Sequence, residues 1–98
     1  MRERKPCVYI TASQRNGTLY TGVTSNLATR VWQHRNDVVD GFTQHHKVHR
    51  LVWYELHETM ESAISREKAI KAWKRAWKIE LIEKTNAYWR DLYDGIWL

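Results

Sequence analysis

The sequence is poor in the residues and segments that mark several protein classes. It contains one cysteine, one proline and four glycines. The lone Cys7 excludes an internal disulfide and a zinc site built on paired thiolates. No segment is apolar and long enough to cross a membrane, and the charged N-terminus, MRERKPC, lacks the apolar core of a secretory signal. We therefore expect a cytoplasmic protein without a membrane partner.

The length and charge of the chain limit its organisation and its partners. Ninety-eight residues allow one modest hydrophobic core and are too few for two. We expect a single domain over residues 1–98, with a basic tail (1–6), a core (7–89) and a C-terminal extension (90–98). The formal net charge of +5 favours a polyanionic partner, although a solvated basic surface gives the same composition. Six tryptophans and five tyrosines exceed what so small a core encloses, so some lie at its edge or on a working surface.

A β-hairpin is predicted near the N-terminus. Asn16-Gly17 separates two β-prone runs, Val8–Ser13 and Thr18–Val23. A type I′ turn needs positive φ at both central residues, and Asn-Gly satisfies this requirement best. A two-residue turn at this position pairs Thr11 with Gly22. Alternation then gives the hairpin two different faces.

One face of this hairpin is apolar and the other carries tyrosines. The apolar face holds Val8, Ile10, Ala12, Leu19, Thr21 and Val23, and the other holds Tyr9, Thr11, Ser13, Tyr20 and Gly22. Gly22 leaves a gap between the tyrosines where a ligand could approach the backbone. An exposed aromatic pair that merely covers the sheet explains the pattern equally well.

A polar corner and an amphipathic helix follow the hairpin. Any of the three corner residues 24–26 can cap the helix, which ends near Asn36. Arg30 and His34 are four residues apart on this helix, so they lie about 6 Å from each other on one stripe. With a tyrosine and a glycine on the preceding strand, they could hold a phosphate.

The middle of the chain is expected to contain a loop and a third strand. Residues 37–47 show no sustained periodicity. His45, His46 and His49 cluster in or just after this segment. A metal site built on them would lack a third defined ligand type and a fixed spacing, so we expect these histidines at the loop surface or near nucleic acid. The segment Arg50–Leu56 is rich in branched and aromatic residues and is predicted to be the third strand.

A second helix, capped by Thr59, is predicted over Met60–Ala72. Glu67 lies on or beside its apolar stripe. The spacing allows an ion pair with Lys71 four residues on, whereas a semi-buried carboxylate could instead hold a divalent cation. The residues alone favour the ion pair.

The helix is expected to continue, after a kink, over Trp73–Lys84. Between Arg66 and Lys84 the chain has seven Lys or Arg and three Glu, a local charge of +4 interleaved with tryptophans. This pattern suits a surface that contacts a nucleic-acid backbone, although a solvated helix face is the ordinary explanation. The candidate contacts are Lys71, Lys74, Arg75 and Lys78. A last short helix is expected over Tyr88–Tyr93, capped by Asn86.

Taken together, these residues resemble the GIY-YIG nuclease family. The matching segments are VYI at Val8–Ile10 and YTG at Tyr20–Gly22, followed by Arg30 and His34 on the next helix and by Glu67 on a later one. The similarity covers nearly the whole chain and is greatest to the small stand-alone bacterial members. It implies an α+β fold with a small three-stranded, mainly antiparallel sheet flanked by helices.

The resemblance also implies an activity. It implies a metal-dependent endonuclease that hydrolyses DNA phosphodiester bonds. Tyr9 and Tyr20 would line the active site, with Tyr20 as the general base that deprotonates the attacking water. Arg30 would stabilise charge on the scissile phosphate, and His34 would orient or activate neighbouring groups. Glu67 would hold one divalent cation, usually Mg²⁺, or another such as Mn²⁺.

Gly22 and Asn86 are candidate supporting residues on the same resemblance. Val23 departs from the repair-nuclease branch of the family, which has a lysine there to activate the tyrosine. This departure motivates a second hypothesis, a non-catalytic or weakly catalytic module that binds nucleic acid on the same fold. A third hypothesis is a structural protein with a basic helix, which would not bind nucleic acid at moderate salt.

Overall fold

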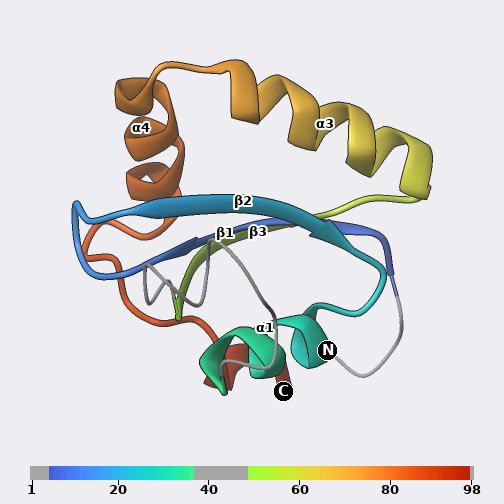
Figure 1. Cartoon of the computed structure of the whole chain (residues 1–98), viewed down its shortest axis with the longest axis horizontal. Helices are drawn as coiled ribbons and strands as arrows, with labels where there is room; N and C mark the ends of the chain where they lie inside the picture. The colour runs from blue at the N-terminus through green and yellow to red at the C-terminus, as the bar shows by residue number, and fades with distance from the viewer. Residues whose placement is uncertain (1–4, 37–48, 98) are drawn as a thin grey trace.

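The fold is a three-layer α+β arrangement around one small sheet. The computed structural model describes residues 5–36 and 49–97. Its elements are β1 (Cys7–Ala12), β2 (Leu19–Thr24), α1 (Leu27–Arg35), β3 (Arg50–Leu56), α3 (Met60–Ala72), α4 (Arg75–Thr85) and the 3-10 helix η1 (Asp94–Trp97). Helices α3 and α4 cover one face of the sheet, the upper face, while α1 and the C-terminal segment cover the lower face (Figure 1). The predicted fold class is confirmed.

All neighbouring strands are antiparallel, in the order β2-β1-β3. The predicted hairpin register was wrong by two residues, because Thr11 pairs with Tyr20 and Tyr9 pairs with Gly22. The turn is longer than two residues: the Gly17 amide donates to the Gln14 carbonyl at 2.9 Å. A shift by two residues preserves side-chain alternation, so the predicted division into two faces survives the error.

The upper face holds the larger apolar core. Val8, Ile10 and Ala12 of β1 are fully buried there, and Leu19 and Val23 of β2 pack against them. Helices α3 and α4 contribute buried residues to the same cluster, including Ile70 and Ile82. An irregularity in the β1–β3 ladder places Val52 and Trp53, which are adjacent in sequence, in this one core.

Side-chain caps fix where the helices begin. Asn26 caps α1, with its Oδ1 accepting from the Thr29 amide at 3.2 Å. Thr59 caps α3 as predicted, since its hydroxyl accepts from the Ser62 amide at 3.1 Å. The expected kink after α3 is a complete break, because Trp73 and Lys74 both have extended backbones. None of the helices in the described residues is long and apolar enough to cross a membrane.

The C-terminal segment differs from the prediction of a helix over residues 88–93. Trp89 has φ of 58°, a left-handed conformation that interrupts a helix. Tertiary contacts hold it there: its side chain is fully buried, and its indole Nε1 donates to Glu83 Oε2 at 2.7 Å. Asn86 ends α4 and does not cap a further helix. The predicted loop over residues 37–47, with His45 and His46, lies outside the described residues.

Candidate active site

Three aromatic rings form the centre of a polar cluster on the lower face. Tyr9 comes from β1, Tyr20 from β2 and His34 from α1. The ring centroids lie 6.3 Å apart for the two tyrosines, 5.8 Å for Tyr9 and His34, and 5.4 Å for Tyr20 and His34. Tyr9 Oη lies 3.0 Å from His34 Nε2, within hydrogen-bond distance. The structure therefore brings three sequence-predicted site residues into direct contact.

Gly22 makes room for the buried tyrosine. A Cβ atom at Gly22 would lie 2.5 Å from Tyr9 Oη and 2.6 Å from Tyr9 Cζ. The Tyr9 side chain is only 2% exposed. The gap expected beside Gly22 is thus filled by the Tyr9 ring and offers no space for a ligand, and the idea of an exposed aromatic pair is wrong for Tyr9.

The buried phenol of Tyr9 remains protonated near neutral pH. Burial raises its pKa above the ordinary value, and the nearby Tyr20 adds to this shift, whereas the charge of Arg30 opposes it. Glu67 also raises this pKa, so its carboxylate lies close enough to act on the cluster. The charges of Arg30 and Glu67, which come from different helices, thus both affect the pKa of Tyr9.

His34 is a neutral imidazole at physiological pH. It is 2% exposed, and burial, followed by the charges of Arg30 and His49, lowers its pKa to about 4. Its Nδ1 has no hydrogen-bond partner within residues 5–36 and 49–97. A neutral histidine cannot add positive charge to the site, so its contribution is the contact with Tyr9.

Glu67 can hold a cation. Its side chain is 14% exposed, and its Oε2 lies 2.9 Å from Lys71 Nζ, so the predicted ion pair is present. A cation thus already lies against this carboxylate, and Lys71, at 51% exposure, can move into solvent. Mg²⁺ commonly binds one or two carboxylates and completes its shell with water and substrate phosphate. The described residues contain no cluster of three or more metal-ligating side chains, so a cation at Glu67 would take most of its ligands from water and substrate.

The other predicted residues lie away from the ring cluster. Asn86 donates to the carbonyls of Val52 at 3.1 Å and Arg90 at 2.8 Å, so it ties the C-terminal segment to β3. Arg75 donates to the carbonyl oxygens of Asn16 and Gly17 and fastens the hairpin turn to α4.

Of the remaining basic candidates, Lys74 lies 5.1 Å from the ring centre of Trp77, and Lys78 is half-buried on α4. His49 acts electrostatically on His34 and is the one described member of the predicted histidine cluster.

Sequence reasoning missed the partners of Tyr9 and the role of Asp91. Asp91 forms an ion pair with Arg35 of α1 and accepts from the Leu51 amide at 3.2 Å, so it joins α1 to β3. The two contacts of Asp91 connect residues 40 and 56 positions apart, and local periodicity carries no signal for them.

Comparisons with known proteins identify the family of the chain. The model of the GIY-YIG catalytic domain matches residues 5–80. The chain is 31% identical over 80 residues to a UPF0213 protein of Staphylococcus saprophyticus, covering 82% of this chain and 96% of that protein. A UPF0213 protein of Staphylococcus aureus is 34% identical over 69 residues, covering 70% of this chain and 84% of that protein.

A solved structure has the same fold. The solution NMR structure of a UPF0213 protein from Bacillus halodurans superimposes with a TM-score of 0.55 and covers 89% of this chain and 92% of that one. The sequence identity between the two chains is 24%.

Proposed function

This chain belongs to the GIY-YIG catalytic domain family, and we propose that it is an endonuclease that hydrolyses DNA phosphodiester bonds with one divalent cation bound at Glu67. The observation that supports this proposal is the meeting of Tyr9, Tyr20 and His34 in one cluster with Arg30 and Glu67 acting on it. These residues come from four separate elements: β1, β2, α1 and α3.

Tyr20 is the better general base of the two tyrosines. Tyr9 is buried and bonded to His34, so water cannot reach its oxygen. Tyr20 is half-buried at the edge of the sheet and remains accessible from solvent. A general base takes the proton of the attacking water, and a phenol needs nearby positive charge to do so at neutral pH. Arg30 is the cation that already acts on this cluster.

Arg30 would bind the scissile phosphate, and Glu67 would bind the divalent cation. The guanidinium of Arg30 can donate two hydrogen bonds to the non-bridging oxygens of the scissile phosphate. A divalent cation at Glu67 would supply Lewis-acid stabilisation of the charge that develops on the phosphate and on the leaving oxygen. His34 and Tyr9 keep the wall of the site rigid. In this proposal the substrate is bacterial DNA, which implies a cytoplasmic location.

A binding module on the same fold is the second candidate. Two observations favour it: Val23 stands beside Gly22 where a lysine could activate the tyrosine, and Lys71 occupies the Glu67 carboxylate. Such a module would bind DNA in a salt-dependent way without needing a divalent cation.

DNA cleavage assays separate these candidates. Wild type is expected to cleave plasmid, branched or single-stranded DNA in Mg²⁺ and not in EDTA. Tyr20→Phe removes a general base and should lower the rate by about 10²–10⁴-fold. Glu67→Gln should abolish the response to Mg²⁺.

Matched variants control for nonspecific damage. Tyr88→Phe changes a tyrosine that is 71% exposed, and Glu61→Gln changes an exposed acid at the start of α3. Both should cleave as wild type does. Cleavage that survives in Tyr20→Phe and Glu67→Gln contradicts the assigned site, whereas salt-sensitive binding without cleavage supports the binding module.

A further inference from the structure

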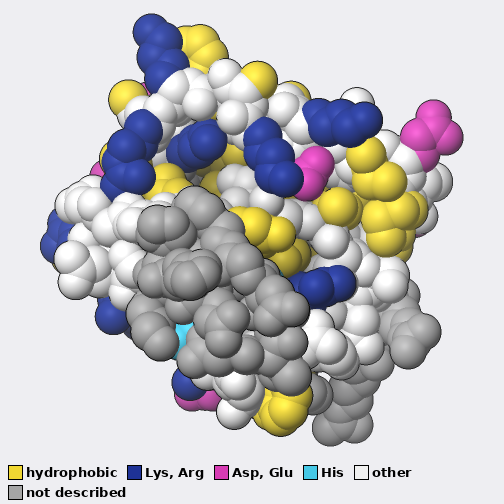
Figure 2. Space-filling model, viewed as in Figure 1, with side chains coloured by type: hydrophobic (Ala, Val, Ile, Leu, Met, Phe, Trp, Pro, Cys, Tyr) yellow, Lys and Arg dark blue, Asp and Glu magenta, His cyan; other side chains and the backbone are white. Residues whose placement is uncertain are grey.

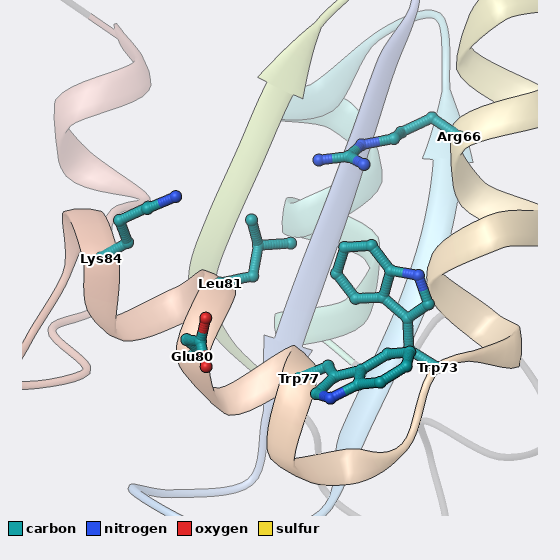
Figure 3. Close-up of a pocket in the computed structure, with 6 residues that line it drawn as sticks. All are labelled: Arg66, Trp73, Trp77, Glu80, Leu81 and Lys84. Atoms are coloured by element: carbon teal, nitrogen blue, oxygen red, sulfur yellow. The ribbon is translucent and has the colours of Figure 1, made fainter.

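A pocket between α3 and α4 is lined by side chains that the candidate active site does not use. Its volume is about 450 Å³, which lies within the range of small-molecule sites. The lining residues are Arg66, Trp73, Trp77, Glu80, Leu81 and Lys84 (Figure 3). We refer to it as the tryptophan pocket. Arg66 and Glu67 are consecutive on α3, so the pocket and the proposed cation site lie on different faces of one helix, about 100° apart.

Two tryptophans form a corner in this pocket. The rings of Trp73 and Trp77 have centroids 6.3 Å apart and stand at 79° to each other. Trp73 and Leu81 pack against the upper core, which holds the floor of the pocket in place. Trp77 is 50% exposed, so a flat partner can reach its ring. Stacking of a nucleobase on an exposed aromatic ring contributes about 1–3 kcal/mol per base.

Cations surround the corner. The Arg66 guanidinium lies 5.4 Å from the ring centre of Trp73, and the Lys74 ammonium lies 5.1 Å from that of Trp77. The Arg66 side chain is held in position by Glu55, whose Oε1 accepts from its Nε at 3.2 Å. Lys and Arg side chains also gather over α3 and α4 on the face shown in Figure 2. This rim is complementary to the phosphates of a nucleic-acid strand.

Glu80 distinguishes a base from a phosphate as the occupant. A carboxylate inside the pocket repels phosphate oxygens, but it can accept hydrogen bonds from the exocyclic amino groups of cytosine or adenine. Together with the apolar floor, Glu80 therefore favours a base in the interior and phosphates at the cationic rim.

We propose that the tryptophan pocket binds an unpaired base of a DNA strand, stacked on Trp77. The base must be unpaired because both of its faces are already stacked within a duplex. The proposal rests on the proposed action on DNA and adds a substrate class to it. The preferred DNA then carries a single-stranded segment.

Binding measurements in EDTA test this proposal without cleavage. The probes are a blunt DNA duplex and the same duplex with a short single-stranded tail that contains 2-aminopurine. Wild type should bind the tailed duplex about tenfold more tightly than the blunt one, and 2-aminopurine fluorescence should be quenched by stacking. Trp77→Ala should remove both the preference and the quenching, while Trp77→Phe should keep most of each.

A second tryptophan of equal exposure is the matched control. Trp32, on α1, is also 50% exposed and lies outside the pocket, so Trp32→Ala should leave the ratio of the two affinities unchanged. Equal binding of both duplexes by wild type, or a ratio that persists in Trp77→Ala, overturns the pocket assignment and leaves the proposed nuclease intact. Failure of wild type to bind either DNA overturns both.

Discussion

The two faces of the sheet use the same strands for different purposes. On the upper face, β1 contributes Val8 and Ile10 to a core of apolar side chains. On the lower face, the alternate residues of the same strand include Tyr9 and Thr11, both buried. Both faces gain stability from apolar burial, but the lower face also contains buried polar atoms that need partners.

Two buried polar atoms on the lower face reduce the folding stability of the domain. His34 Nδ1 and Thr11 Oγ1 are buried without hydrogen-bond partners among the described residues. Each such group costs about 1–3 kcal/mol in folding.

The largest expected effect is on the upper face. Ile70→Ala removes a fully buried side chain on α3 and should lower the free energy of unfolding by about 2–5 kcal/mol. Urea denaturation measures this loss. Ile64→Ala, on the same helix at 37% exposure, should change it by less than about 0.5 kcal/mol. Equal losses in the two variants would mean that α3 does not pack on the sheet as described.

The second-largest expected effect is a pH dependence of folding stability that His34 on the lower face causes. The unfolded chain protonates His34 near pH 6.5, whereas the folded chain does so only near pH 4. The unfolded state therefore binds more protons in this window, and stability should fall with falling pH by an amount of order 3 kcal/mol.

Urea denaturation at several pH values between 7 and 4 measures this slope. His34→Gln should flatten it. His57→Gln should leave the contribution of His34 in place, because His57 is hydrogen-bonded to Glu55 and Ser62, whereas His34 is bonded to Tyr9. An unchanged slope in His34→Gln would show that other groups govern the acid sensitivity.

Gly22→Ala should have the smallest effect on stability of the three variants but should disturb the candidate site directly. Gly22→Ala places a methyl group 2.5 Å from Tyr9 Oη, so the Tyr9 ring must move away from His34. Overpacking of this kind costs about 1–3 kcal/mol, and DNA cleavage should fall further than the lost stability explains. Gly95→Ala has nothing within 4 Å of its added Cβ and should be neutral in both measurements. Full activity in Gly22→Ala would show that the Tyr9–His34 contact is not needed for DNA cleavage.

Local chemistry predicted much of the fold. Thr59 was identified as a cap and Arg50–Leu56 as a strand, because both depend on neighbouring residues alone. The hairpin register failed because Asn16-Gly17 was assigned a two-residue turn, whereas a longer turn closed by Gln14 forms. Local sequence also could not predict the left-handed backbone of Trp89, because burial and the hydrogen bond to Glu83 hold it in place.

The sequence identified Tyr9, Tyr20 and His34 as candidates but did not predict the contacts among them. The resemblance named Tyr9 and His34 separately, but their hydrogen bond depends on how α1 packs beneath the sheet. That Tyr9 is buried and Tyr20 more accessible follows from the same packing. Single-sequence patterns contain alternation and periodicity, and neither specifies the distance between a strand and a helix.

The burial of Ile96 has a consequence for the order in which the domain matures on the ribosome. This side chain belongs to the lower core with Tyr9 and Leu27. Synthesis proceeds from the N-terminus, so the strands and helices emerge before residue 96 does. The upper core is complete once Trp89 has been translated, whereas the lower core also needs Ile96. A nascent chain would therefore complete its lower face last, when nearly all of the domain already exists.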